Sequence, residues 1–321
     1  MSQNNDTYKL IKSARLIDGM GGPALERGSI LVQNDKIKEV GTEESVIPPD
    51  GVQVQEFNYE DKTVLPGLID CHVHLIGIGD GRIGNQLVTL PDEVLTLQAA
   101  RNARTHLYSG VTTVRDCGAK NQTTLMLRKA MNMGITPGPR LVLSGRPLAI
   151  IGGHLSYFGI EATGPDECRA AVRQLIKEGV DYIKITATGG STVTSFQLRP
   201  SFNPDELRAI CDEVHKFGKH AAAHCINNQG ISNAIEAGVD TIIHSYFQEP
   251  DGTPKFQPAL AERMAKQGIF VNATLGAAYT RIKSLEEQFE TQEPTKEEQA
   301  ELDKSKTMWE SKMDWFRRLR E

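Results

Sequence analysis

Hydrophobic and polar positions follow two different patterns along the 321-residue chain. In residues 7–62, short runs of alternating apolar and polar residues are separated by turn-forming residues such as Asn34, Asp35 and the Pro-Pro-Asp-Gly segment at 48–51. This pattern is typical of β-strands joined by tight turns. We therefore expect a small, incomplete β-sandwich domain over residues 1–63. The expected strands cover residues 8–17, 29–32 and 36–40.

From residue 64 onward, short apolar runs alternate with longer amphipathic segments. The amphipathic segments predict helices that begin near a proline and stop at a glycine such as Gly179, Gly238 or Gly268. Repeated strand–helix units favour an α/β fold with a parallel sheet, most simply a (β/α)8 TIM-type barrel over residues 64–321. Seven strands are expected, starting near residues 65, 111, 140, 181, 220, 240 and 269. The expected helices cover residues 91–108, 123–133, 165–178, 204–217, 229–237 and 258–267.

The eighth strand of such a barrel has no counterpart in the hydrophobic pattern. Residues 284–306 are too polar for a barrel core, and a final helix follows, with Trp309, Met313 and Phe316 spaced for one face. This helix runs to Glu321 without a glycine or asparagine cap. We expect that the chain is cut short before the eighth strand; the alternative is a naturally short form.

Composition and charge narrow the function classes. Hydrophobic content of 39% and charged content of 24% are typical of a soluble globular protein, and the net charge of −5 offers no basic surface for nucleic acid. No run is long enough to span a membrane, and the first six residues carry no apolar signal segment. Five cysteines without a Cys-x-x-Cys pair favour reduced thiols in the cytoplasm. A small-molecule partner is expected, and a homo-oligomer remains open.

Histidines stand at the ends of several predicted strands. His72 and His74 form a His-x-His pair, and alternation along a strand points both imidazoles to one face. His224 and His244 end the fifth and sixth barrel strands. Because active sites of such barrels lie at the carboxyl ends of the strands, we expect these imidazoles to converge on a divalent metal such as Zn²⁺. The alternative for each one alone is a hydrogen-bonded core histidine.

Longer motifs around these histidines resemble a known family. The segment Pro66-Gly67-Leu68-Ile69-Asp70-Cys71-His72-Val73-His74 matches the "PGxIDxHxH" signature of the amidohydrolase superfamily. The Gly-Gly-His segment ending at His154 and the Thr-Gly-Gly segment at 188–190 resemble its imidazolonepropionase-like branch, which includes Xaa-Pro dipeptidases. The resemblance implies a metal-dependent barrel beside a β-sandwich that is completed by strands from after the barrel.

The resemblance also implies a ligand set. In this family the strand-four lysine, which corresponds to Lys184, is carboxylated by CO₂ and bridges two divalent ions, with Zn²⁺ expected. An unmodified ammonium has no acceptor and cannot bind a cation, so the alternative for Lys184 is a buried ion-pair lysine. His154 would contact the substrate carbonyl; the alternative is an exposed turn histidine. The expected metal ligands are His72, His74, Lys184, His224 and His244.

The activity implied by the resemblance is hydrolysis of C–N bonds in small substrates such as Xaa-Pro dipeptides or N-acyl amino acids, by metal-hydroxide attack. The family's strand-eight Gly-Thr-Asp, which carries the general base, is absent after the seventh strand. Its loss would leave this chain inactive unless Asp116 replaces the base. The alternative function is a non-catalytic relative that binds a ligand or a partner chain. The remaining histidines, His106, His215 and His220, are expected on the surface or the lower barrel face.

Overall fold

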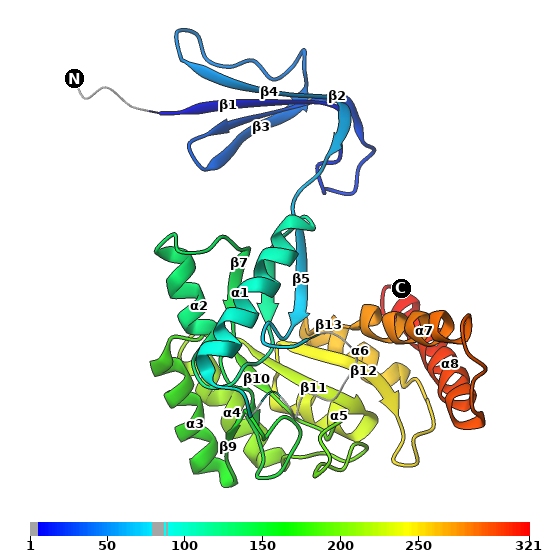
Figure 1. Ribbon diagram of the computed structural model, residues 1–321. Helices are drawn as coiled ribbons and strands as arrows, with labels where there is room; N and C mark the ends of the chain where they lie inside the picture. Colours follow the sequence, from blue (N-terminus) through cyan, green and yellow to red (C-terminus); the bar gives the residue numbers. More distant parts are fainter. Residues whose placement is uncertain (1–5, 79–86, 88) are drawn as a thin grey trace. The chain divides into compact units, whose positions relative to one another are not determined.

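A computed structural model describes residues 6–78, 87 and 89–321 of the chain (Figure 1). The chain divides into two compact units, residues 1–68 and 69–321. The sequence placed this boundary between residues 63 and 64. The boundary lies later because strand β4 runs to Val64, where its carbonyl oxygen accepts a hydrogen bond from the backbone N–H of Ile17 at 2.9 Å.

The first unit contains one four-stranded sheet in the order β3-β2-β1-β4. The two-residue turn between β2 and β3 holds Asn34 at φ = 57°, a conformation that asparagine tolerates well. Within the described residues there is no second sheet that would complete the expected sandwich. Strand β4 was not predicted, because most of its side chains are polar and exposed. The strands are β1 (Tyr8–Leu16), β2 (Leu25–Gln33), β3 (Lys36–Thr42) and β4 (Val54–Val64).

Among the described residues, the second unit contains nine strands. They belong to a three-stranded sheet, β5-β6-β7, and a six-stranded sheet, β13-β12-β11-β10-β8-β9, and the pairs from β10 to β13 are parallel. Two short strands, β8 and β9, were not expected. The strands are β5 (Leu68–Val73), β6 (Val111–Asp116), β7 (Arg140–Leu143), β8 (Leu148–Ala149), β9 (Ile160–Glu161), β10 (Ile183–Ile185), β11 (Ala221–Asn227), β12 (Thr241–Gln248) and β13 (Phe270–Asn272).

Helices follow most of these strands, and the six expected helices lie within one residue of their predicted bounds. The glycine stops are left-handed as expected, with φ = 95° at Gly179 and φ = 84° at Gly238. The end of helix α7 and the first half of α8 lie in the charged stretch, residues 284–306, for which no element was predicted. The helices are α1 (Asp92–Tyr108), α2 (Thr123–Asn132), α3 (Gly164–Glu178), α4 (Pro204–Lys216), α5 (Asn228–Ala237), α6 (Pro258–Gln267), α7 (Leu275–Phe289) and α8 (Lys296–Arg318).

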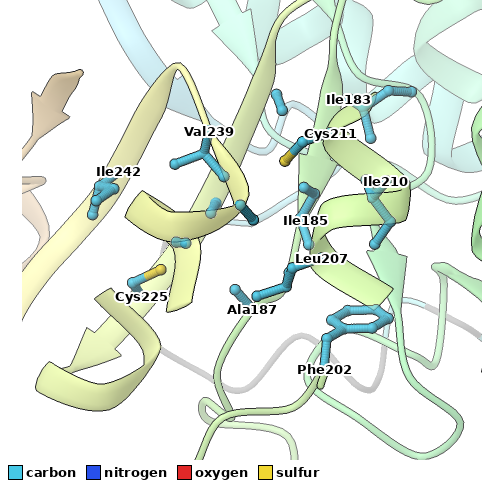
Figure 2. Close-up of a cluster of buried hydrophobic side chains, with 14 of the residues drawn as sticks. Ile183, Ile185, Ala187, Phe202, Leu207, Ile210, Cys211, Cys225, Val239 and Ile242 are labelled. Carbon is cyan, nitrogen blue, oxygen red and sulfur yellow. The ribbon is translucent and has the colours of Figure 1, made fainter. Parts of the chain in front are cut away.

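The largest apolar core of the second unit lies between the six-stranded sheet and its covering helices. Figure 2 shows Ile183 and Ile185 of β10 directed toward Leu207 and Ile210 of α4. Because side chains alternate along a strand, Lys184 between the two isoleucines faces away from this core. The core therefore fixes the direction of the one charged residue in β10.

The same alternation continues into β11. Ala221, Ala223 and Cys225 belong to the helix-covered core, whereas Ala222 packs on the opposite face with Tyr182. The residue on that opposite face after Ala222 is His224. Two neighbouring parallel strands thus bury their apolar residues under the helices and turn polar side chains to the other side of the sheet.

The final helix contributes to the core through a different face from the expected one. Trp315 is 6% exposed and joins the large core, and Leu302 packs against α7 residues. Met313 and Phe316, expected on the buried face, are only partly buried. The buried face also includes Lys312, whose ammonium lies 3.5 Å from the centre of the Tyr246 ring. Among the described residues, no helix has the length and apolar character required to span a bilayer.

Candidate metal centre

A cavity of about 300 Å³ lies at the carboxyl ends of β5, β10, β11 and β12. Its wall is completed by the loop between β8 and β9 and by the loop after β10. All six residues that the sequence assigned to the site line this one cavity. They are His72, His74, His154, Lys184, His224 and His244. The structure therefore brings together residues that are up to 172 positions apart, from His72 to His244.

The imidazole rings form a continuous series around the cavity. The ring of His72 lies 5.4 Å from that of His74 and 5.1 Å from that of His244, measured between ring centres. His244 lies 4.6 Å from His224, and His224 lies 4.5 Å from His154. Five imidazoles in mutual contact are a dense set of nitrogen donors.

In two of the rings, hydrogen bonds to carbonyl oxygens fix which nitrogen is available. His74 Nδ1 is 2.8 Å from the carbonyl oxygen of Gly118, and His224 Nε2 is 2.9 Å from that of Gly189. A carbonyl oxygen only accepts, so these nitrogens carry the proton and the other nitrogen of each ring keeps its lone pair. This arrangement, in which backbone oxygens orient imidazoles, is common around protein metal sites. In addition, Nδ1 of His72 is buried without a hydrogen-bond partner.

The backbone of β12 is distorted at the site. Ile242 belongs to the helix-covered core and Ile243 to the opposite face, so simple alternation would turn His244 toward the helices. Instead His244 has φ = 71° and Ser245 has φ = 52°, and His244 lines the cavity with Nδ1 2.8 Å from Thr274 Oγ1. Left-handed conformations in non-glycine residues are strained and often accompany functional sites.

Burial and charge keep the imidazoles neutral. Burial, with a contribution from the Lys184 charge, lowers the pKa of His74 to about 4 and that of His154 to about 3. Burial also lowers the pKa values of His72, His224 and His244 well below 6.5. Neutral imidazoles are the form that binds metal ions.

Lys184 is the unusual member of the group. It is 1% exposed and makes no hydrogen bond or ion pair with any described residue. Burial lowers the pKa of its amine. An isolated buried ammonium is costly, so this lysine needs either to lose its proton or to gain a partner.

The donor chemistry fits a divalent ion, but the side chains do not form a closed site. Across residues 6–78, 87 and 89–321, no group of three or more His, Cys, Asp or Glu side chains is arranged to hold a metal ion. The available donors are the nitrogens of five imidazoles and the Lys184 amine, with no carboxylate among the described residues that line the cavity. Neutral imidazoles, one of them with a buried unpaired nitrogen, nevertheless match the ligand preference of Zn²⁺-type ions.

Asp116 lies beside the site without facing the cavity. Its Oδ2 accepts the backbone N–H of Leu75 at 2.7 Å, and its Oδ1 accepts that of Gly118 at 3.1 Å. Burial raises the pKa of this carboxyl group to about 6. Both oxygens hold the backbone around His74, so the geometry does not favour the suggestion that Asp116 replaces a catalytic base.

Other predictions about individual residues can now be placed. His215 and His220 lie outside the cavity and contact Asp240 on opposite oxygens. His106, on α1, lies 3.9 Å from Asp70 and lines a larger cleft that shares His72, His74 and His244 with the cavity. The cavity also contains rim residues that no sequence pattern had singled out, namely Leu155, Ser191, Gln197, Ile226 and Tyr246.

Comparison with known proteins agrees with this arrangement of fold and site. Residues 63–290 match the Amidohydrolase family, and this is the greater part of the chain. The chain belongs to this family, whose members generally bind divalent metals.

Its relatives include several hydrolases. An ochratoxinase of Aspergillus niger is 28% identical over 295 residues, covering 83% of this chain and 58% of the relative. The chain thus spans less than two thirds of that relative. An imidazolonepropionase of Mesorhizobium japonicum is 23% identical over 303 residues, covering 85% of this chain and 70% of the relative. A solved Xaa-Pro dipeptidase with bound methionine is 28% identical, with a TM-score of 0.76 over 98% of this chain and 76% of the other.

The neutral imidazoles make the stability of the metal-free protein dependent on pH. Below pH 6.5 the unfolded chain protonates its histidines, whereas folded His74 and His154 stay neutral to about pH 4 and about pH 3. The unfolded state then binds more protons, so the free energy of unfolding decreases as the pH is lowered. The loss is about 1.4 kcal/mol per pH unit for each such imidazole between about pH 6 and about pH 4.

Asp116 has the opposite effect, because its folded pKa of about 6 lies above its ordinary value of 3.8. Between these values the folded state binds one more proton than the unfolded state, which increases the free energy of unfolding as the pH is lowered. Urea unfolding of metal-free protein at pH 7, 6 and 5 measures the net effect. We expect the midpoint to fall steadily across this series. A constant or rising midpoint would show that the imidazoles titrate normally.

Proposed function

We propose that this protein is a metal-dependent hydrolase of C–N bonds in small molecules, of the amide or peptide kind. The observation that carries the proposal is the convergence of five neutral imidazoles and one buried, unpartnered lysine on a single cavity. Family membership supports the hydrolase class. The substrate and the metal requirement are our proposal for this chain.

In this proposal two divalent ions, with Zn²⁺ as the expected metal, would be held by His72, His74, His224 and His244. Lys184 would supply oxygen ligands after its neutral amine adds CO₂, a reaction that forms an N–C bond and releases one proton. The resulting carbamate would share one negative charge over two oxygens, so it would replace an uncompensated cation by a ligand that a divalent ion prefers. The lowered pKa of the Lys184 amine favours the neutral form that this addition needs.

When bound, such ions polarise a carbonyl group and lower the pKa of water, which provides a nucleophile at neutral pH. The chain's own residues orient and enclose the substrate. His154 faces the same cavity from the loop between β8 and β9 and would donate a hydrogen bond to the carbonyl oxygen. Gly118 and Gly189 keep His74 and His224 in the tautomers that expose their lone pairs.

We further propose that seven of the eight strand positions of a (β/α)8 barrel are occupied by β5, β6, β7, β10, β11, β12 and β13. A cleft of about 810 Å³ supports this assignment. One side of the cleft consists of β5 and α1 residues such as His72 and Asn102, and the other of β12 and β13 residues such as His244 and Asn272. Among the described residues, β5 and β13 each pair with one strand, so the cleft lies between two sheet edges. Such edges accept a further strand.

The substrate class is proposed from the family branch and from the cavity. The names of two relatives refer to a dipeptidase and an ochratoxinase. The Gly-Gly-His loop that presents His154 is the feature this chain shares with the dipeptidase branch. We therefore expect Xaa-Pro dipeptides or N-acyl amino acids as substrates.

Metal content gives the first test. His72→Ala removes one imidazole from the cavity and should lower the Zn²⁺ bound after equilibrium dialysis at least tenfold, in line with loss of a ligand. His220→Ala, which removes an exposed histidine outside the cavity, is the matched control and should bind as the unaltered chain does. Equal zinc content in both variants, measured by elemental analysis, would contradict the proposed ligand set.

Turnover gives the second test. The zinc-loaded protein is assayed against a panel of Xaa-Pro dipeptides, N-acyl amino acids and nucleobase-like cyclic amides. Because no acidic residue among the described ones lines the cavity to act as a general base, we expect only slow hydrolysis of a member of the first two groups. His154→Asn should lower this kcat about a further 10²-fold, because one donor to the carbonyl oxygen is displaced. Zinc content of the variant should stay unchanged. Activity confined to the cyclic amides, or no activity at all, would overturn the substrate proposal.

A further inference from the structure

The loop after β10 surrounds His154 and controls how its ring is held. The ring rests against Gly190, where a β-carbon would lie 2.5–2.6 Å from three ring atoms, so only glycine fits beneath the ring. Thr194 Oγ1 donates to the carbonyl oxygen of Gly152 at 2.7 Å and joins this loop to the Gly-Gly-His segment. The ring therefore has one permitted place between the two loops.

The hydroxyl group of Thr192 contacts both the ring of His154 and the backbone of the next residue, Leu155. Thr192 Oγ1 accepts the backbone N–H of Leu155 at 2.9 Å and lies 3.2 Å from His154 Nδ1. Thr192 is 6% exposed and His154 is 7% exposed, so water has little access to either group. No other described side chain hydrogen-bonds to the ring of His154.

Hydrogen-bond counting decides the direction of this contact. A hydroxyl group has one proton to donate and two lone pairs, and the Leu155 N–H occupies one lone pair. If His154 Nδ1 carried the proton, it would donate to the second lone pair and leave the buried hydroxyl proton without an acceptor. If Nδ1 is unprotonated, the hydroxyl donates to it, so the hydroxyl proton and Nδ1 are both satisfied. An unsatisfied buried donor is costly, so the second arrangement is favoured.

We infer that Thr192 is a positioning residue that holds His154 in the tautomer with the proton on Nε2. Nε2 then presents an N–H to the cavity, where it acts as a donor and not as an acceptor. In the opposite tautomer Nε2 would carry a lone pair and repel a carbonyl oxygen. This inference rests on the proposed hydrolase function for its catalytic consequence, whereas the tautomer itself is a property of the folded chain.

Nitrogen NMR of protein labelled with ¹⁵N-histidine tests the tautomer directly, with His154→Asn to assign the signals. We expect a pyrrole-type shift at Nε2 and a pyridine-type shift at Nδ1 of His154. Thr192→Ser keeps the hydroxyl group and should preserve both shifts. Thr192→Val replaces the hydroxyl with a methyl group of similar size and should move both shifts toward a mixture of tautomers. A proton on Nδ1 in the unaltered chain, or unchanged shifts in Thr192→Val, would overturn the inference.

Kinetic measurements distinguish the effect of Thr192 on the His154 tautomer from a purely structural role in the loop. On the panel substrate that is hydrolysed, Thr192→Val should lower kcat about fivefold or more, the value of one hydrogen bond, with a smaller change in KM. Thr192→Ser should restore kcat. Equal kcat in Thr192→Val and the unaltered chain would overturn the catalytic consequence. If the expected NMR shifts are seen but the unaltered chain hydrolyses nothing, the proposed function fails while the tautomer assignment stands.

Discussion

The burial of the Lys184 amine is the constraint on which the candidate site depends. Ile183 and Ile185 anchor β10 in the helix-covered core, so the lysine between them must project to the other face of the sheet. There it is 1% exposed and has no ion pair or hydrogen bond with a described residue. A buried cation without a partner is unfavourable, and the surrounding imidazoles are kept neutral partly by its charge. A modification that makes the amine anionic would resolve this conflict and would suit metal binding.

Much of the site could be predicted from residue order because it follows from regular strands. His72 and His74 share a face by alternation, and Lys184 and His224 are flanked by residues that fill the outer core. His244 is different, since alternation alone would turn it toward the helices. Its left-handed backbone returns it to the cavity, and no simple pattern in the sequence encodes that distortion. Its place in this strand was predictable, but its direction was not.

Contacts made by loops and by the C-terminal helices could not be predicted from the sequence patterns. Thr192 and Gly190 hold His154 through a loop whose path depends on hydrogen bonds between distant segments, and residue spacing does not record them. Strand β4 was missed because its polar residues suit a small exposed sheet. The buried face of α8 was predicted wrongly, because Trp315 packs in the core where Phe316 was expected. In each case tertiary packing outweighed local periodicity.

The most direct test of this account asks whether Lys184 carries a carbamate. Zinc-loaded protein is equilibrated with ¹³C-bicarbonate and examined by ¹³C NMR. The account predicts a carbamate carbon signal that disappears in Lys184→Met and persists in Lys266→Met, which alters an exposed lysine. No carbamate signal in the unaltered protein, or a signal that survives in Lys184→Met, would contradict the central claim.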